Sequence, residues 1–371
     1  MGNHLVLAGG GHAHMMTLSR INELVSRGHR VTVIGPSAHH YYSGMGPGML
    51  GGTYTPAQIR FDTRRVTEKN GGTFVCDRVE HIDANQRIVH LASGETVAYD
   101  VLSCNLGSHV PRNLVTEDSG GIYTVKPIEK LMEARQRILE IIAGRKATIA
   151  VAGGGPAASE IAGNIHYLAA ESGLTMPTVY MCAGKAFMAR FPEKVRNLTR
   201  QALNDRGVMV DETAFVRTIQ TGAVTLESGR TIEAAVIFLA LGVIPSPVFE
   251  VSGLAMGPDK GLRVNEFLQS VSHPEIFGGG DCIYFEPRPL DKVGVYAVRQ
   301  NPVLYANLLA SLEGRPLQPF DPGGDYLLIF NTGHRTGILK KRGLIYKGRT
   351  AFMLKDYIDR RFMRKFQAFE Q

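Results

Sequence analysis

The sequence HLVLAGGGHAHMMTL at residues 4–18 decides how the rest of the chain is organised. An apolar run at residues 5–8 meets three consecutive glycines, and the residues after them can turn directly into a helix, as at the start of a βαβ dinucleotide-binding unit. Gly9 allows the chain to reverse without a Cβ clash, and Gly11 allows backbone N–H groups to approach phosphate oxygens. His14 occupies the third position of the fingerprint, where a small residue is usual. The stretch predicts a turn that binds pyrophosphate.

The chain repeats this construction at residues 147–165, which read ATIAVAGGGPAASEIAGNI. Gly153, Gly155 and Ala158 satisfy the pattern G-x-G-x-x-A in full, behind an apolar strand at 148–152 and ahead of a helix rich in Ala, Ile and Glu. Two such units in one chain predict two bound dinucleotides.

Length and composition are those of an ordinary globular protein. The chain has 371 residues, of which 44% are hydrophobic and 20% charged, and this is enough for two or three domains with full cores. The N-terminal apolar run is too short for a secretory signal, and no stretch approaches the ~20 apolar residues of a membrane span. These features predict a cytoplasmic protein.

The cysteines are too widely spaced for a metal or disulfide motif. No C-x-x-C pair occurs, which argues against a zinc site, a disulfide scaffold and a dithiol redox centre. We expect each cysteine to be a buried thiol. The four are Cys76, Cys104, Cys182 and Cys282.

The net charge of +7 is located at the C-terminus. Residues 334–371 carry eleven Lys and Arg against three Asp and Glu, so the rest of the chain is nearly neutral. Neutral nucleotide-binding units argue against a nucleic-acid partner, and the basic tail favours an acidic one.

Three strand ends bear on nucleotide binding. The strands expected at 29–34 and 178–181 both end without the acidic residue that often binds a ribose, and Cys182 stands in that place in the second unit. A third element, at 276–280, ends in three glycines and is followed by Asp281. Asp281 can accept a hydrogen bond from a ribityl hydroxyl or cap a helix.

An ordered set of motifs carries a resemblance to a known family. The chain resembles the two-dinucleotide-binding-domain FAD oxidoreductases of the pyridine nucleotide-disulfide oxidoreductase superfamily. Within this superfamily it is most similar to the flavoprotein module that is fused to selenide, water dikinase, and also to the type II NADH dehydrogenases. The motifs are GGGHAH (9–14), YSGMGPGMLGG (42–52), YDVLSCNLGS (99–108), VKPI (125–128), GGGPAASE (153–160), FGGGD (277–281) and GVYAVRQNPVLYANL (294–308).

The resemblance implies an α/β fold of two Rossmann-like domains, the second inserted in the first. We expect an FAD-binding domain at 1–112 and 262–320, an NAD(P)-binding domain at 113–261, and a small basic amphipathic segment at 321–371. FAD is the implied cofactor, and NAD(P)H is the implied substrate.

The resemblance also assigns residues to each site. The FAD residues it implies are Gly9, Gly11, His12, Ala13, Val79, Asn105, Gly107, Asp281, Tyr296 and Ala297. The nicotinamide residues are Gly153, Gly155, Ala158, Glu160, Cys182 and Gly242. Tyr296 and Gln300 match the positions of the quinone-site glutamines, and we take them as the catalytic candidates.

The remaining polar candidates have simpler interpretations. His12, His14, His39 and His40 have no cysteines or carboxylates at ligand spacing, so we expect them to line a cleft and expect no metal site. Lys126 is expected on a connecting strand, with its side chain in solvent.

A helix is expected at 350–371, with Leu354, Ile358, Phe362, Phe366 and Phe369 recurring at three- and four-residue spacing and basic residues mostly off that stripe. Such a helix suits an anionic membrane surface, which would place the protein peripherally on the inner face of the membrane. The alternative is that the stripe packs on the protein's own core or on a second subunit of a homodimer.

The leading functional hypothesis is an FAD enzyme that passes electrons from NAD(P)H to a quinone or another small acceptor at the membrane surface. The first alternative is a sulfide- or selenium-linked flavoprotein. The second is a flavin-binding redox sensor or partner protein without significant turnover.

Overall fold

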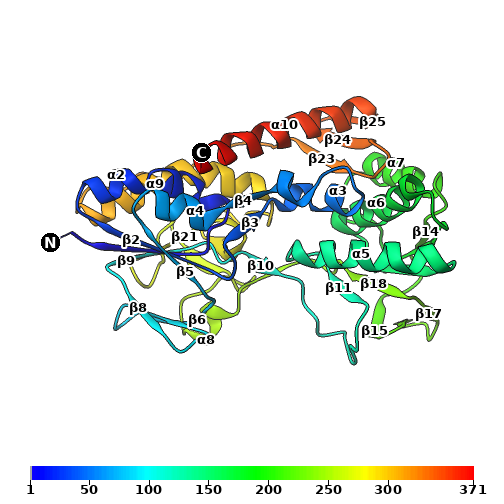
Figure 1. Ribbon diagram of the computed structural model, residues 1–371, viewed down its shortest axis with the longest axis horizontal. Coiled ribbons are helices and arrows are strands. Elements are labelled where there is room, and N and C mark those ends of the chain that lie inside the picture. The colour runs from blue at the N-terminus through cyan, green and yellow to red at the C-terminus, as the bar shows by residue number, and fades with distance from the viewer. Residues whose placement is uncertain (1) are drawn as a thin grey trace.

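A computed structural model describes residues 2–371 and contains two parallel sheets of five strands each (Figure 1). The first sheet has the order β21-β9-β1-β2-β5, and every residue of its central strand β1 is buried. Burial of a whole strand is expected where helices cover both faces of a parallel sheet. The strands are β1 (His4–Ala8), β2 (Arg30–Gly35), β5 (Thr73–Cys76), β9 (Val101–Cys104) and β21 (Ile276–Gly278).

The second sheet repeats this arrangement with the order β11-β18-β12-β13-β14. Its central strand β12 occupies the place that β1 has in the first sheet, and all its neighbours are parallel. The strands are β11 (Ile122–Thr124), β12 (Thr148–Ala152), β13 (Thr178–Cys182), β14 (Met209–Asp211) and β18 (Val236–Leu239). The predicted fold class, with one Rossmann-like unit inserted in another, is confirmed.

Helices pack on each sheet. The first sheet is covered by α1 (Met15–Ser19), α2 (Ile21–Ser26), α4 (Thr63–Lys69) and α9 (Gly294–Leu312). The second is covered by α5 (Glu129–Gly144), α6 (Pro156–Ser172) and α7 (Glu193–Asn204), while α3 (Gly46–Leu50) contacts both α5 and α6. A short helix α8 (Val248–Val251) contacts β6.

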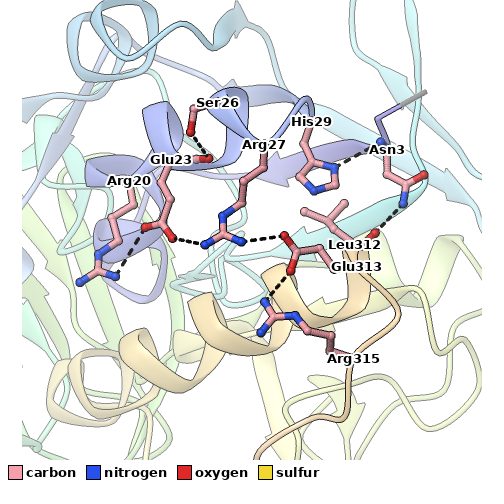
Figure 2. Close-up of polar contacts among 9 residues, drawn as sticks. All are labelled: Asn3, Arg20, Glu23, Ser26, Arg27, His29, Leu312, Glu313 and Arg315. Carbon is pink, nitrogen blue, oxygen red and sulfur yellow. Dashed lines mark hydrogen bonds and ion pairs between the residues drawn. The ribbon is translucent and has the colours of Figure 1, made fainter.

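The end of α9 is joined to the N-terminal helices, as Figure 2 shows. Arg27 donates to Glu23 at 3.1 Å and to Glu313 at 3.0 Å, and the side chain of Asn3 donates to the carbonyl of Leu312 at 2.7 Å. The contacts of Arg27 with Glu313 and of Asn3 with Leu312 join residues 286 and 309 positions apart, so the late helix completes the fold of the first strands.

Smaller antiparallel elements surround the two sheets. Each sheet has a three-stranded meander beside it, β6-β7-β8 and β15-β16-β17. The strands are β6 (Val79–Asp83), β7 (Ile88–Leu91), β8 (Thr96–Ala98), β15 (Val216–Gln220), β16 (Ala223–Leu226) and β17 (Thr231–Glu233). A further antiparallel pair is β3 (His39–Tyr41) with β4 (Arg60–Asp62), whereas β20 (Leu262–Val264) pairs in parallel with β22 (Ile283–Phe285).

The two passages of the chain between the sheets pair with each other. β10 (Ser108–His109) leaves the first unit, β19 (Ile244–Pro245) returns to it, and the two form an antiparallel ladder. The crossings therefore lie side by side.

The C-terminal segment forms a three-stranded sheet followed by a long helix that extends over both units in Figure 1. The strands are β23 (Leu328–Asn331), β24 (Gly337–Lys341) and β25 (Leu344–Gly348), and the helix is α10 (Arg349–Gln367). The predicted helix is confirmed. Among residues 2–371, no helix is both long enough and apolar enough to span a membrane.

The predicted apolar stripe on α10 is divided in two. Phe366 is buried in the core, and Phe362 and Phe369 pack against that core, so this half of the stripe follows the alternative interpretation. Leu354 and Ile358, by contrast, are 39% and 42% exposed. Packing on the core therefore accounts for only the C-terminal half of the stripe.

Candidate functional site

The first glycine turn begins where β1 ends. Gly9 has a φ of +95°, and its N–H donates to the carbonyl of Ile34 at 2.8 Å. A Cβ at Gly9 would come within 2.3 Å of the carbonyl oxygen of Asn105, and one at Gly11 within 2.8 Å of the Asn105 side-chain nitrogen. Gly9 therefore requires glycine, because it turns at positive φ against the end of β9, whereas a Cβ at Gly11 would displace the Asn105 side chain.

The third element meets the first at this turn. A Cβ at Gly279 would come within 2.7 Å of the Cβ of Ala13, and one at Gly280 within 2.8 Å of the Asn105 side-chain oxygen. Ala297, at the start of α9, lies 3.7 Å from the same Gly280 position. The structure thus brings together five of the residues predicted to bind FAD: Gly9, Gly11, Ala13, Asn105 and Ala297.

Two buried polar atoms at this turn have no hydrogen-bond partner within residues 2–371. They are Nδ2 of Asn105 and Nε2 of His12. Buried polar groups are normally paired, so such atoms indicate a polar ligand beside them. The close glycine backbone and the Asn105 amide fit the pyrophosphate-bearing cofactor FAD.

Asp281, which follows the third element, is held by two residues from other parts of the chain. Its Oδ2 accepts from Lys126 Nζ at 2.8 Å and from Ser108 Oγ at 2.9 Å. Burial alone would raise the pKa of Asp281, but the charge of Lys126 and these hydrogen bonds lower it below its ordinary value. The expectation of a solvated Lys126 is wrong, because its charge is paired with a residue 155 positions away.

The histidines divide into two kinds. His14 is fully buried, with Nδ1 2.6 Å from the Gly9 carbonyl and Nε2 2.8 Å from Ser103 Oγ, so it belongs to the core and does not line a cleft. This pairing explains how a large residue fits the third position of the fingerprint. His12 and His40 hydrogen-bond to each other at 3.2 Å. Within residues 2–371, no three His, Cys, Asp or Glu side chains are placed to hold a metal ion.

Gln300 and Tyr296 lie on α9 in different environments. The Gln300 side chain is buried, and its Oε1 accepts from the N–H of Gly280 at 2.7 Å, so it holds the turn of the third element. Tyr296 is half-buried and packs edge-on against Tyr326 at 5.6 Å between ring centroids.

Two further FAD candidates lie beside β9 and in the meander. Gly107 has a φ of +67° two residues after Asn105, and Val79 is the half-buried first residue of β6. Both stay predictions, since their contacts do not distinguish a ligand from ordinary packing.

The second glycine turn has the same design as the first. Gly153 has a φ of +142°, and a Cβ there would come within 2.2 Å of the Ala240 carbonyl oxygen. Gly155 precedes α6, and a Cβ there would meet no atom of residues 2–371 within 4 Å. Ala158 is fully buried, whereas Gly242, with a φ of +91°, has open space at its Cβ position. The N-terminus of this helix of 17 residues is therefore open to a phosphate.

Cys182 ends β13, the strand whose end often carries the ribose acid. It is buried, and burial raises the pKa of its thiol to about 12. Asp211, opposite it on β14, was not identified from the sequence. The Asp211 carboxylate already accepts from Tyr180, from Thr213 and, at 3.3 Å, from Arg230. Asp211 therefore does not replace the missing acid.

The carboxylate of Glu160 contacts the C-terminal segment, and its place in the nicotinamide site stays a prediction. Its Oε1 accepts from the N–H of Asn331 in β23 at 2.7 Å. Burial raises the pKa of Glu160 to about 7, although the nearby charge of Lys355 and the Asn331 hydrogen bond act in the opposite direction. No pattern in the sequence relates these two positions, which are 171 residues apart.

The cysteines are all unpaired within the described residues. Cys104, Cys182 and Cys282 are buried as expected, but Cys76, at the end of the edge strand β5, is exposed. Cys104 and Cys282 lie close together behind the first site, and burial raises the pKa of both thiols.

Two dinucleotide folds, one inserted in the other, define the class of two-domain dinucleotide oxidoreductases. The family model described as pyridine nucleotide-disulphide oxidoreductase matches residues 3–301. The chain therefore belongs to the pyridine nucleotide-disulphide oxidoreductase family. This confirms the resemblance and, with it, the prediction of an FAD-dependent oxidoreductase, for which NAD(P)H is the expected substrate.

Individual relatives are distant. An NADH dehydrogenase-like protein of Mycobacterium tuberculosis is 27% identical over 220 residues, or 57% of this chain, and the chain spans only about half, 55%, of its length. Demethylphylloquinone reductase NdbB of Synechocystis is 28% identical over 270 residues, 70% of this chain and 65% of the relative. The structure of NDH2 from Plasmodium falciparum in complex with NADH superposes with a TM-score of 0.82 at 13% identity, over 100% of this chain and 97% of that one, and shows likeness of fold.

Proposed function

We propose that this chain takes electrons from a reduced nicotinamide dinucleotide and passes them, through FAD, to a quinone or another small acceptor at a membrane surface. The observation that carries the proposal is the contact of Lys126 with Asp281. Lys126 lies two residues after β11 of the second sheet, and Asp281 three residues after β21 of the first. Their contact supports a shared junction at which the two nucleotides would meet.

The residues of the first site have separate parts in this proposal. FAD, when bound, supplies the electron-transfer chemistry. The backbone at Gly9 and Gly11 would hold its pyrophosphate, and Asp281 would face its ribityl chain. Gln300 would act as a positioning residue for the turn of the third element, since its Oε1 already accepts a hydrogen bond from the N–H of Gly280.

A face of α10 supports contact with a membrane. Met353, Leu354, Tyr357 and Ile358, which we call the α10 face, are 65%, 39%, 56% and 42% exposed. Exposed Arg361, Arg364 and Lys365 follow on the same helix. Apolar side chains beside cations suit insertion among anionic headgroups, with each cation near the surface contributing about 1 kcal/mol.

The cysteines argue against the sulfide-linked alternative. A thiol relay needs reactive thiolates near the flavin, whereas burial raises the pKa of Cys104, Cys182 and Cys282. Cys76 is exposed but lies at the edge strand of the first sheet.

Flavin absorbance provides the test. Purified protein is mixed anaerobically with NADH, NADPH or sulfide, and a quinone is then added. Bleaching by a nicotinamide followed by recovery with quinone is expected. Bleaching by sulfide alone would establish a sulfide- or selenium-linked flavoprotein. No bleaching by any donor would establish a flavin-binding redox sensor or partner protein without significant turnover.

A further inference from the structure

Two histidines form a hydrogen-bonded pair beside the first glycine turn. His12 follows Gly11 directly and is 9% exposed, and its Nδ1 lies 3.2 Å from Nε2 of His40 in β3. The two rings are nearly perpendicular, at 74° with centroids 5.0 Å apart. Neither side chain has a part in the backbone cradle that would hold pyrophosphate.

The other ring nitrogen of His12 is the unusual atom. Nε2 is buried, and nothing in residues 2–371 hydrogen-bonds to it. An unpaired buried polar atom costs about 1–3 kcal/mol, so its retention indicates a polar group of a ligand at this place. The charges of Lys126 and Asp281, the pair that joins the two sheets, act on the pKa of His12 in opposite directions.

Aromatic side chains surround the pair. Phe362 of α10 stacks on His12 at 5.5 Å between centroids, and Phe61 lies 5.1 Å from His40. Tyr42 lies 5.1 Å from His12, but its hydroxyl donates to Asp359 at 3.1 Å. The pair is therefore packed among aromatic rings, and the one hydroxyl among them is already engaged by Asp359.

Both rings are neutral near pH 7. Burial lowers the pKa of His12 to about 4 and that of His40 well below its ordinary value, and the charge of Lys126 lowers both further. A neutral imidazole has one N–H and one acceptor nitrogen. The pair can therefore pass a proton along without either ring staying charged.

We propose that His40 and His12 relay a proton to the acceptor that is reduced at this site. The inference rests on the proposed function, whose overall reaction is NAD(P)H + H⁺ + quinone → NAD(P)⁺ + hydroquinone, and it supplies the one proton taken from solvent. His40 takes a proton at Nδ1 and gives its Nε2 proton to Nδ1 of His12. His12 then releases its Nε2 proton to the reduced quinone oxygen, and both rings end as neutral tautomers.

The test compares two acceptors after the protein has been reduced anaerobically by a nicotinamide. Quinone needs protons, whereas ferricyanide takes electrons alone. His40→Phe keeps the ring packing, so we expect reoxidation by quinone to slow at least tenfold while reoxidation by ferricyanide stays within twofold. Added imidazole should partly restore the quinone rate.

The neighbouring residue His39 provides a matched control. Its Nε2 lies 3.9 Å from the Asp62 carboxylate, outside the aromatic group. His39→Gln should therefore leave both rates unchanged. In spectra of ¹⁵N-histidine-labelled protein, the coupling across the His12 and His40 nitrogens should disappear in His40→Phe and persist in His39→Gln.

Three results would overturn the relay. An unchanged rate of reoxidation by quinone in His40→Phe, or an equal slowing with quinone and ferricyanide, would contradict the relay and leave the proposed function intact. A wild-type protein that reduces ferricyanide but no quinone would contradict both the proposed function and the relay.

Discussion

The ammonium of Lys126 lies 2.8 Å from the carboxylate of Asp281, and this contact joins the ends of two sheets that are built separately along the chain. Both side chains are largely buried, with 26% and 17% of their surface exposed. Removing one partner of such a pair leaves the other charge without compensation.

Lys126→Met should lower the free energy of unfolding by about 1–3 kcal/mol at pH 7, less than for a fully buried pair because both groups reach solvent. The pKa of Asp281 is lowered in the folded state, so the pair stabilises the protein above the ordinary pKa of 3.8, and this contribution is lost as the pH falls below that value. Urea unfolding at pH 7 and pH 3 measures both effects. The double variant with Asp281→Asn should recover part of the loss, and equal stability of Lys126→Met and wild type at pH 7 would contradict the prediction.

Gly11→Val should abolish FAD content, because a side chain there would enter the space beside Asn105 that the cofactor needs. Gly155→Val is the matched variant. Its Cβ has open space in the protein, so it should fold and keep FAD but lose at least tenfold in reduction by NAD(P)H. Flavin absorbance after purification and anaerobic reduction rates separate the two sites. Unchanged reduction by NAD(P)H in Gly155→Val would mean that the second turn does not bind the nicotinamide dinucleotide.

Cys182→Glu should shift nucleotide preference towards NADH by about tenfold or more, because a carboxylate there can bind the ribose 2′-hydroxyl and repel a 2′-phosphate. Asp211 does not fill this role, since its oxygens are already engaged. Steady-state kcat/KM values with NADH and NADPH give the ratio, and Cys182→Ser serves as the control for size. A strong NADH preference in the wild type would show that another acid is present.

Replacing the four residues of the α10 face with serine should abolish binding to vesicles that contain phosphatidylglycerol, while FAD content and ferricyanide reduction persist. Phe366→Ala, in the buried part of the same helix, should instead cost about 3–5 kcal/mol of stability. Deleting residues 350–371 would not distinguish these effects, because it removes core and face together. Unchanged vesicle binding with a loss of dimer in sedimentation would assign the face to a second subunit.

Glu160→Gln should change how stability depends on pH. The pKa of Glu160 is raised from 4.5 to about 7 in the folded state, so the contribution of this group to stability is fully present below about pH 4.5 and is lost as the pH rises to 7. The variant removes this loss and keeps an oxygen for the Asn331 N–H. Between pH 5 and pH 8 the variant should gain on the order of 2–3 kcal/mol relative to wild type in urea unfolding. A constant difference across this range would contradict the prediction.

The sequence predicted the elements whose geometry is local. Gly9 and Gly153 must be glycines because each turns at positive φ against a carbonyl at the end of the next strand, and a glycine run after an apolar strand is a reliable sign of such a turn. The position of Asp281 followed from the same logic at a third strand.

The remaining site residues depend on contacts between distant segments. Whether Lys126 is solvated is decided by Asp281, and the side to which Glu160 turns is decided by Asn331. The spacing of the apolar residues correctly predicted a helix at α10. Whether each of these residues is buried, as Phe366 is, or exposed, as Leu354 is, depends on where the helix passes over the core. Such information lies in the tertiary structure and leaves no periodic pattern in the sequence.

The ladder between β10 and β19 has a mechanical consequence. Both crossings run together through two paired positions, Ser108 with Pro245 and His109 with Ile244. The two units also meet where α3 packs on α5 and α6, and where the C-terminal segment contacts both, since β23 contacts α6 and α10 contacts β4. The inserted unit is therefore attached at three separate places, and a rotation about the paired crossings would have to break the other two contacts.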